Sequence, residues 1–301
     1  MYSKTAVKIY AAKQHGLIKS NAHFRREFGS KESISRLEQD TGYYEQYLTE
    51  NDISLVCAFD ENFPVLPPCV KPGDIPYFFA YKGDISLLSD RSKNTAVVGV
   101  LTPTANIIER ERKIVELLVQ GGLNVLSGFA RGCDTVAHKS CIDTGGKTIA
   151  FLPTTLDSIY PKENTSLAQQ IVESGGLVIT EYISPPANRY ERIKRFIERD
   201  RLQAMFAANV ILIASYDKGQ GDSGSRHAMQ KATEYGAVRY VMYNHYTDTD
   251  LPIFALNRRL ADEGAEILTP KAIITNIFRL LDLKLLTDFK NARKRGIFRR
   301  K

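Results

Sequence analysis

The chain has 301 residues, of which 43% are hydrophobic and 25% are charged. This is the composition of a folded, water-soluble protein with one large core. No apolar run approaches the ~20 residues that a membrane span needs. The first residues, Met1 to Lys4, lack the apolar core of a secretion signal. These features argue against a membrane or secreted protein, and we expect a cytoplasmic one.

The cysteines do not form a metal-binding or redox motif. None of the four stands in a CxxC pair, so reduced thiols are expected. Cys133, His138 and Cys141 could contribute to a metal site, but no fourth ligand lies at a suitable spacing. The sequence therefore predicts no metal and no cofactor.

The positive charge is concentrated at the C-terminus. The formal net charge is +7, and residues 290–301 contain seven Lys and Arg side chains and no acidic one. Residues 1–289 consequently sum to zero, so any polyanion site in the body must be a local patch. The basic tail over residues 287–301 suits nucleic acid, or it is simply a solvated end.

The first 93 residues differ in pattern from the rest. Residues 1–50 have apolar positions at helical spacing and predict a small N-terminal region of two or three short helices. A short strand is predicted over residues 53–59. The prolines that follow predict an extended, loop-rich lead-in over the remainder of residues 51–93.

From residue 94 to 286, short apolar runs alternate with amphipathic segments of helical length. The predicted strands are residues 96–100, 123–126, 148–152, 177–180, 210–214 and 240–243. The predicted helices are residues 105–120, 134–143, 164–174, 191–206 and 225–235, with more helix over residues 252–286. This alternation predicts an α/β fold with a Rossmann-like, doubly wound, mostly parallel sheet.

Three loops that follow predicted strands are suited to a polyanion. Ligands of such sheets bind at the carboxyl ends of the strands. Glycines there let backbone N–H groups approach an oxygen, and the helix that follows presents its positive end. The loops contain Gly99 and Thr102; residues 127–132, with Arg131 as a cation; and residues 219–225, which precede Arg226. They fit neither the dinucleotide fingerprint GxGxxG nor the P-loop GxxxxGK[ST].

Several motifs in order resemble the DNA processing protein A (DprA, also called Smf) family. Residues 127–134 with Ala137 and His138 are similar to its SGxAxGxDxxAH signature. Residues 146–152, 156–164 and 175–181 resemble GxTIAVL, LDxxYPxEN and GLxxSE. Residues 196–202 resemble FPxRNRI, and residues 223–225 open a segment similar to SGSLxTA. Residues 63–66 and 257–265 resemble YPxxL and NxLIxxGA. The resemblance runs from about residue 53 to about residue 270.

The resemblance implies a homodimeric, non-enzymatic protein that binds single-stranded DNA. Such a protein helps load a RecA-type recombinase on incoming DNA during natural transformation or other DNA processing. Among the residues implied at the phosphate path, the glycine-loop members are Gly99, Thr102, Ser127, Gly128, Arg131, Gly132, Ser223, Gly224 and Ser225. The others are Lys162, Asn164, Arg195, Phe196, Arg199 and Arg201. Residues 189–201 interleave cations with aromatics, as single-strand binding requires.

Three departures mark a divergent member. The family has an arginine two residues after the first-strand glycine, whereas here Val100 and Leu101 follow Gly99. Asp200 stands where the family motif has asparagine, which places a carboxylate near the phosphate path. Many members carry a C-terminal winged helix, for which this chain has no room.

Three acidic or imidazole side chains have two interpretations each. Asp134 and His138 share a helix face, as an acid/base pair or, as we favour, a cap and a structural histidine. Glu181 either binds a sugar hydroxyl or caps a turn. The alternative function is a nucleotide-binding or nucleoside-phosphate N-glycoside hydrolase on the same fold. Residues 219–229 resemble the PGGxGTxxE pattern of such phosphoribohydrolases but lack its glutamate.

Overall fold

The computed structural model describes residues 2–269. Its strands are β1 (Ser54–Cys57), β2 (Phe78–Gly83), β3 (Asn94–Val98), β4 (Asn124–Ser127), β5 (Thr148–Phe151), β6 (Leu177–Thr180), β7 (Asn209–Leu212), β8 (Val238–Val241) and β9 (Glu266–Ile267). The helices are α1 (Lys4–Gln14), α2 (Asn21–Phe28), α3 (Lys31–Ser35), α4 (Gly42–Glu50), α5 (Ala105–Gln120), α6 (Cys133–Asp143), α7 (Thr165–Glu173), α8 (Arg189–Met205), α9 (Arg226–Glu234) and α10 (Ala255–Asp262).

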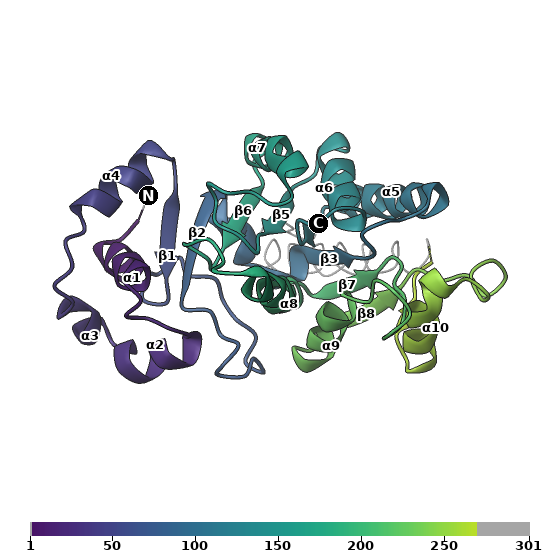
Figure 1. The fold of residues 1–301 in the computed structure, drawn as a ribbon. Coiled ribbons are helices and arrows are strands. Elements are labelled where there is room, and N and C mark those ends of the chain that lie inside the picture. The colour runs from purple at the N-terminus through teal and green to yellow at the C-terminus, as the bar shows by residue number, and fades with distance from the viewer. Residues whose placement is uncertain (1, 270–301) are drawn as a thin grey trace, which may run out of the picture.

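The strands form one sheet in the order β1-β2-β6-β5-β4-β3-β7-β8-β9. Strands β3 to β9 run parallel to their neighbours, while β1 and β2 add an antiparallel edge next to β6. Helices α5, α6 and α7 cover one face, and α8, α9 and α10 cover the other (Figure 1). The predicted α/β doubly wound fold is confirmed, since all six predicted strands are present.

The central strands are mostly apolar along their whole length, and they are buried. All residues of β3, β5 and β6 are buried, as a parallel sheet covered on both faces requires. The order in which strands are added to the sheet reverses between β3 and β7, which are themselves parallel, since β4, β5 and β6 lie on one side of β3 and β7, β8 and β9 on the other. The carboxyl ends of β3 and β7 therefore form the switch point at which such sheets bind ligands.

The N-terminal region and the lead-in are more ordered than the sequence predicts. Residues 1–50 contain four helices rather than two or three, beside β1 at the sheet edge (Figure 1). Their buried side chains, such as Ile9 and Leu48, share a core with Phe78 and Ile171 of the sheet and its covering helices. The lead-in supplies β2 after the proline-rich stretch. Residues 270–301, including the predicted helix beyond residue 269 and the basic tail, lie outside the described residues.

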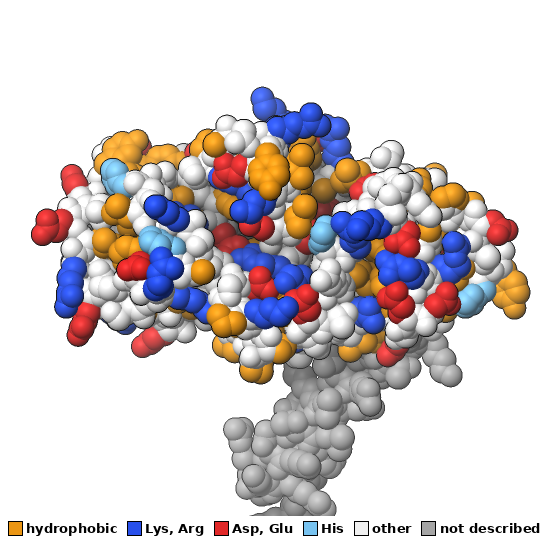
Figure 2. Space-filling view, turned by 60° about the horizontal axis from the view of Figure 1, so that its bottom comes forward, with side chains coloured by type: hydrophobic (Ala, Val, Ile, Leu, Met, Phe, Trp, Pro, Cys, Tyr) orange, Lys and Arg blue, Asp and Glu red, His pale blue; other side chains and the backbone are white. Residues whose placement is uncertain are grey.

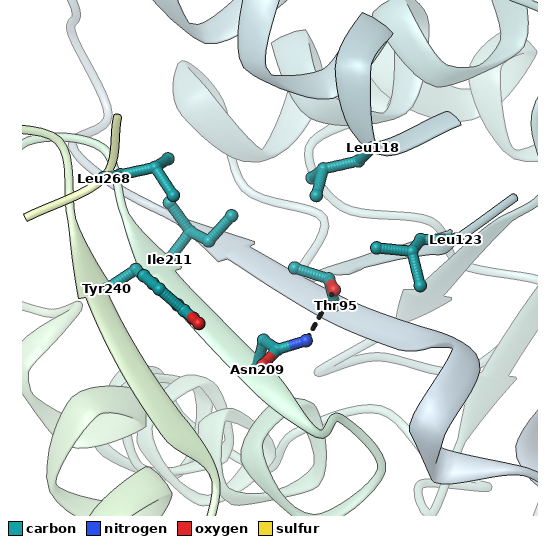
Figure 3. A pocket seen from close by; sticks show the side chains of 7 residues that line it. All are labelled: Thr95, Leu118, Leu123, Asn209, Ile211, Tyr240 and Leu268. Carbon is teal, nitrogen blue, oxygen red and sulfur yellow. Dashed lines mark hydrogen bonds between the residues drawn. The ribbon is translucent and has the colours of Figure 1, made fainter. Parts of the chain in front are cut away.

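A small cavity lies at the opposite end of the sheet. It lies near the amino ends of β3 and β7, where the Asn209 amide donates a hydrogen bond of 3.3 Å to Thr95 Oγ1 (Figure 3). Leu118, Leu123, Ile211 and Leu268 also line it, and its volume is about 20 Å³. A cavity of this size holds about one water molecule. It is too small for a nucleotide.

Candidate nucleic-acid interface

A cleft of about 660 Å³ opens at the switch point between β3 and β7. The loop after β3 contributes Gly99 and Leu101, and the loop after β4 contributes Ala130 and Arg131. The loop after β7, with the start of α9, contributes residues 222–228, while one face of α8 forms a wall. Figure 2 shows Lys, Arg and hydrophobic side chains around a hollow in the middle of this face. The cleft is large enough for a nucleotide unit.

Arg199 is the cation nearest the floor of this cleft. Only 3% of its side chain is exposed, and its Nη1 lies 3.6 Å from carboxylate oxygens of both Asp134 and Asp200. Within residues 2–269, the Nε and Nη1 atoms of Arg199 have no hydrogen-bond partner. Buried guanidinium donors are normally paired, so this arginine has unused hydrogen-bonding capacity. Its place depends on Gly128, because a Cβ there would lie 1.5 Å from Arg199 Nη1.

The two carboxylates beside Arg199 have different partners. Asp134, in the first turn of α6, accepts a hydrogen bond of 3.1 Å from the backbone N–H of Ala130. Asp200 accepts one of 3.1 Å from the Gln203 amide. Burial raises the pKa of Asp200 to about 7; the ionised Arg199 lowers this pKa, and nearby Asp134 raises it further. Arg199, Asp134 and Asp200 together form the floor of the cleft. When both carboxylates are ionised, the floor has one more negative than positive charge.

The rim combines cations with aromatic and aliphatic side chains. Tyr160 and Phe196 meet edge to face at 5.9 Å between ring centroids, and the Arg192 guanidinium lies 5.8 Å from the Tyr160 ring. Ile193 and Ile197 of α8 line the same wall and are 50% and 44% exposed. Exposed aromatic and apolar faces next to cations provide surfaces on which unpaired bases stack.

Three arginines at the rim of the cleft form no ion pair with an acidic side chain of the described residues. Among the described residues, Arg189, Arg192 and Arg226 make no ion pair within 4 Å, and all three line the cleft. Arg131, by contrast, is exposed and forms an ion pair with Glu163, which raises the pKa of Arg131. The unpaired arginines supply the positive charge that a phosphate backbone requires.

The loop after β7 is fixed to the loop after β3. Asp222 Oδ2 accepts a hydrogen bond of 2.6 Å from the Leu101 N–H, and Ser225 Oγ donates one of 2.9 Å to the Gly99 carbonyl. Both loops therefore hold a defined shape at the mouth of the cleft. Because the Ser225 hydroxyl donates its hydrogen to the Gly99 carbonyl, it cannot donate the same hydrogen to a ligand.

The structure brings together about half of the predicted site residues. Those that line the cleft are Gly99, Arg131, Phe196, Arg199, Ser223, Gly224 and Ser225. Gly128 packs directly against Arg199 without lining the cleft. Gly132 starts α6 with a φ of +73°, and a Cβ there would lie 2.4 Å from two backbone carbonyl oxygens, so its role is conformational. Thr102 and Lys162 are exposed and outside the cleft lining.

Four of the residues predicted at the phosphate path form hydrogen bonds within the protein. Arg201 forms two hydrogen bonds of 2.7 Å to the Glu181 carboxylate. Arg195 is 5% exposed and binds Glu191 and the Ser184 carbonyl. Ser127 donates to the Val97 carbonyl at 2.7 Å.

The fourth is the buried amide of Asn164, which donates to the Phe129 carbonyl and to Thr135 Oγ1.

The structure also places the three side chains with two interpretations. Glu181 neither caps a turn nor faces the cleft, because its carboxylate pairs with Arg201. His138 is fully buried between Thr148 Oγ1 at 2.7 Å and the Gly128 carbonyl at 2.9 Å. Burial lowers the pKa of His138 to about 4, in agreement with a structural histidine. Asp134 binds the loop before α6 and does not occupy its N-cap, which is Gly132.

On α8, the cleft residues Ile193 and Gln203 were not predicted, whereas Arg189 and Arg192 belong to the basic segment over residues 189–201 that the sequence indicated. Arg189, Arg192, Ile193 and Gln203 line the cleft together with Phe196. Their spacing of three or four residues places them on one helix face. Tyr160, from the loop before α7, belongs to the segment that resembles LDxxYPxEN but was not predicted as a site residue. Among residues 2–269, no cluster of three or more His, Cys, Asp and Glu side chains could hold a metal, and no helix is long and apolar enough to cross a membrane.

The fold and the cleft define a Rossmann-like α/β protein with a cleft at the switch point of its sheet. Residues 54–278 match the model of the DNA recombination-mediator protein A family. The chain belongs to this family, because the match covers more than half of it.

Relatives and solved structures agree with this assignment. The chain is 30% identical over 284 residues to the DNA processing protein DprA of Streptococcus pneumoniae, covering 88% of this chain and 97% of that protein. It is 37% identical over 172 residues to the protein Smf of Synechocystis, covering 57% of this chain but only 40% of that relative. The match to the protein Smf of Borreliella burgdorferi likewise covers 40% of that relative.

Among solved structures, DprA of S. pneumoniae has a TM-score of 0.70 at 23% identity, covering 91% of this chain and 98% of that one. DprA of Helicobacter pylori, whose structure concerns its mode of single-stranded DNA binding, has a TM-score of 0.60 at 25% identity and covers 76% and 96%.

Proposed function

We propose that this chain binds single-stranded DNA in the cleft between β3, β7 and α8, as a recombination mediator of DNA processing. The observation that carries the proposal is the α8 wall, where unpaired Arg189 and Arg192 alternate with exposed apolar side chains. Phosphates would contact the arginines, and bases would lie on Tyr160, Phe196 and the isoleucines. The single-stranded DNA binding of the H. pylori relative supports this choice of ligand.

The wider role extends this proposal. A strand held in the cleft would be delivered to a RecA-type recombinase on incoming DNA, in natural transformation or a related DNA-processing event. We propose that the protein acts as a homodimer in the cytoplasm and without catalysis. The membership in the recombination-mediator family supports the mediator role.

One observation favours a second candidate function. Asp134 and Asp200 place two carboxyl groups beside a cleft of nucleotide size, as acid/base catalysis on a nucleoside phosphate would require. However, Asp134 is held by Arg199 and the Ala130 N–H. The two functions differ in their products, because only the hydrolase releases a free base.

The test is a pair of assays on the full chain. Fluorescence anisotropy should show tighter binding of an oligothymidylate than of a duplex of equal length. The Arg192→Ala variant should weaken this binding severalfold, while Arg112→Ala, an exposed arginine on the other face of the sheet, should not. Equal affinity for duplex, or equal effects of both variants, would contradict the proposal. Base release from nucleoside monophosphates would instead support the hydrolase.

A further inference from the structure

The cleft floor has an excess of negative charge for a site that is to receive phosphate. Asp134 and Asp200 flank the single guanidinium of Arg199 at 3.6 Å each. A phosphate entering beside Arg199 would meet two carboxylates in a desolvated place, where like charges repel strongly. One of the carboxylates must lose its charge for an anion to bind well.

The hydrogen bonds identify Asp200 as the group that changes protonation. Asp134 is held by a hydrogen bond from the backbone N–H of Ala130. Asp200 has only the Gln203 amide among its hydrogen-bond partners in the described residues. The other charged or titratable groups that line this cleft come from four places: Asp222 in the loop after β7, Arg226 and His227 of α9, Arg189 and Arg192 of α8, and Arg131 and Tyr160 in the loops after β4 and β5. Burial lowers the pKa of His227, so His227 is mostly neutral at pH 7.

We propose that Asp200 determines which phosphate groups the cleft accepts, and that the floor binds a singly charged phosphodiester together with one proton on Asp200. A doubly charged phosphate monoester would be disfavoured, because it adds a further negative charge beside Asp134. This inference rests on the proposed function. The pKa of Asp200, raised to about 7 by burial, places the proton exchange near neutral pH.

The direction of the pH dependence follows from linkage. An anion on the floor raises the pKa of Asp200, so binding takes up a proton. Below pH 7 Asp200 is already protonated in the free protein, and the affinity should be flat. Above pH 7 the affinity should fall by up to about tenfold per pH unit, since one proton is taken up.

The experiment measures the affinity of the full chain for an oligothymidylate between pH 6 and pH 9. The wild type should show the fall above pH 7, and Asp200→Asn should bind more tightly at pH 8 with a nearly flat profile. Asp143→Asn, an exposed aspartate at the end of α6, removes the same charge and should leave the fall intact. Any dependence that persists in Asp200→Asn belongs to another group such as His227. Equal profiles for wild type and Asp200→Asn would overturn the inference.

Two further measurements keep the inference testable if Asp200→Asn fails to fold. Titration calorimetry of the wild type at pH 8, in two buffers of different ionisation enthalpy, should show uptake of about one proton. No uptake would overturn the proposal. In competition at pH 8, thymidine 5′-(methyl phosphate), with one charge, should displace the oligonucleotide better than thymidine 5′-phosphate, with two. The reverse order would overturn the selectivity. Absence of oligonucleotide binding at every pH would overturn the proposed function itself.

Discussion

Arg199 lies where Gly128 leaves room for it: a Cβ on Gly128 would be 1.5 Å from Arg199 Nη1 and 2.2 Å from Asp134 Oδ2. The glycine of the loop after β4 and the arginine of α8 are 71 positions apart in the sequence, yet each requires the other. The loop glycine therefore serves to admit a side chain to the floor of the cleft, in addition to any approach of the ligand to the backbone.

The first prediction concerns this packing. Gly128→Ala should displace the Arg199 guanidinium, lower the stability by ~1–3 kcal/mol, as overpacking does, and weaken binding of single-stranded DNA. Thermal unfolding and anisotropy measure the two effects. Gly73→Ala is the control, because a Cβ on Gly73 meets nothing within 4 Å. Normal binding by a folded Gly128→Ala protein would show that the position of Arg199 is unimportant.

The second prediction separates structural from ligand-binding arginines. Arg201 and Glu181 form a buried, doubly hydrogen-bonded pair. Arg201→Ala leaves a buried carboxylate unpaired and should cost ~3–5 kcal/mol of unfolding free energy, measured by urea denaturation. The double variant Arg201→Met with Glu181→Leu should recover much of this loss. If Arg201→Ala were as stable as the wild type and only bound DNA less well, our structural assignment would be wrong.

The sequence predicts the helices and strands around the cleft, but it does not predict which partner each side chain contacts. The spacing of apolar residues predicts the strands of the sheet and the helix α8, because this spacing depends only on which side chains are buried. It does not predict which arginines of that helix face the cleft. Arg195 and Arg201 turn to buried acceptors, whereas Arg192, in the same basic segment, remains unpaired on the cleft wall. Strand β2 was missed because it follows a proline-rich stretch and lies at an antiparallel edge.

The third prediction uses the exposed pair of Arg131 and Glu163. Arg131→Ala should weaken single-strand binding severalfold without loss of stability, because the side chain is solvated. Glu163→Gln should act in the opposite direction, since it frees the guanidinium for phosphate. Anisotropy at low salt measures both, and unchanged affinity in both variants would show that Arg131 is only a surface charge.

The fourth prediction concerns the basic tail, which lies outside the described residues and is inferred from the sequence. Deletion of residues 290–301 removes seven positive charges. If the tail contacts DNA, the truncated chain should bind more weakly at low salt. Its plot of log K against log[salt] should be flatter by roughly 0.7 for each phosphate that the tail neutralises in the full chain. The two proteins should converge at high salt. Identical slopes would mean that the tail does not contact DNA.

Photocrosslinking tests most directly whether a single strand occupies the cleft. An oligonucleotide containing bromodeoxyuridine, irradiated with the full chain and analysed by mass spectrometry, should crosslink to Tyr160, Phe196 or neighbouring residues of α8. Excess unlabelled oligothymidylate should suppress these crosslinks, and Arg192→Ala should reduce them. Crosslinks confined to α1–α4 or α10, with none on α8 or the loops after β3, β4 and β7, would contradict the assignment of the cleft.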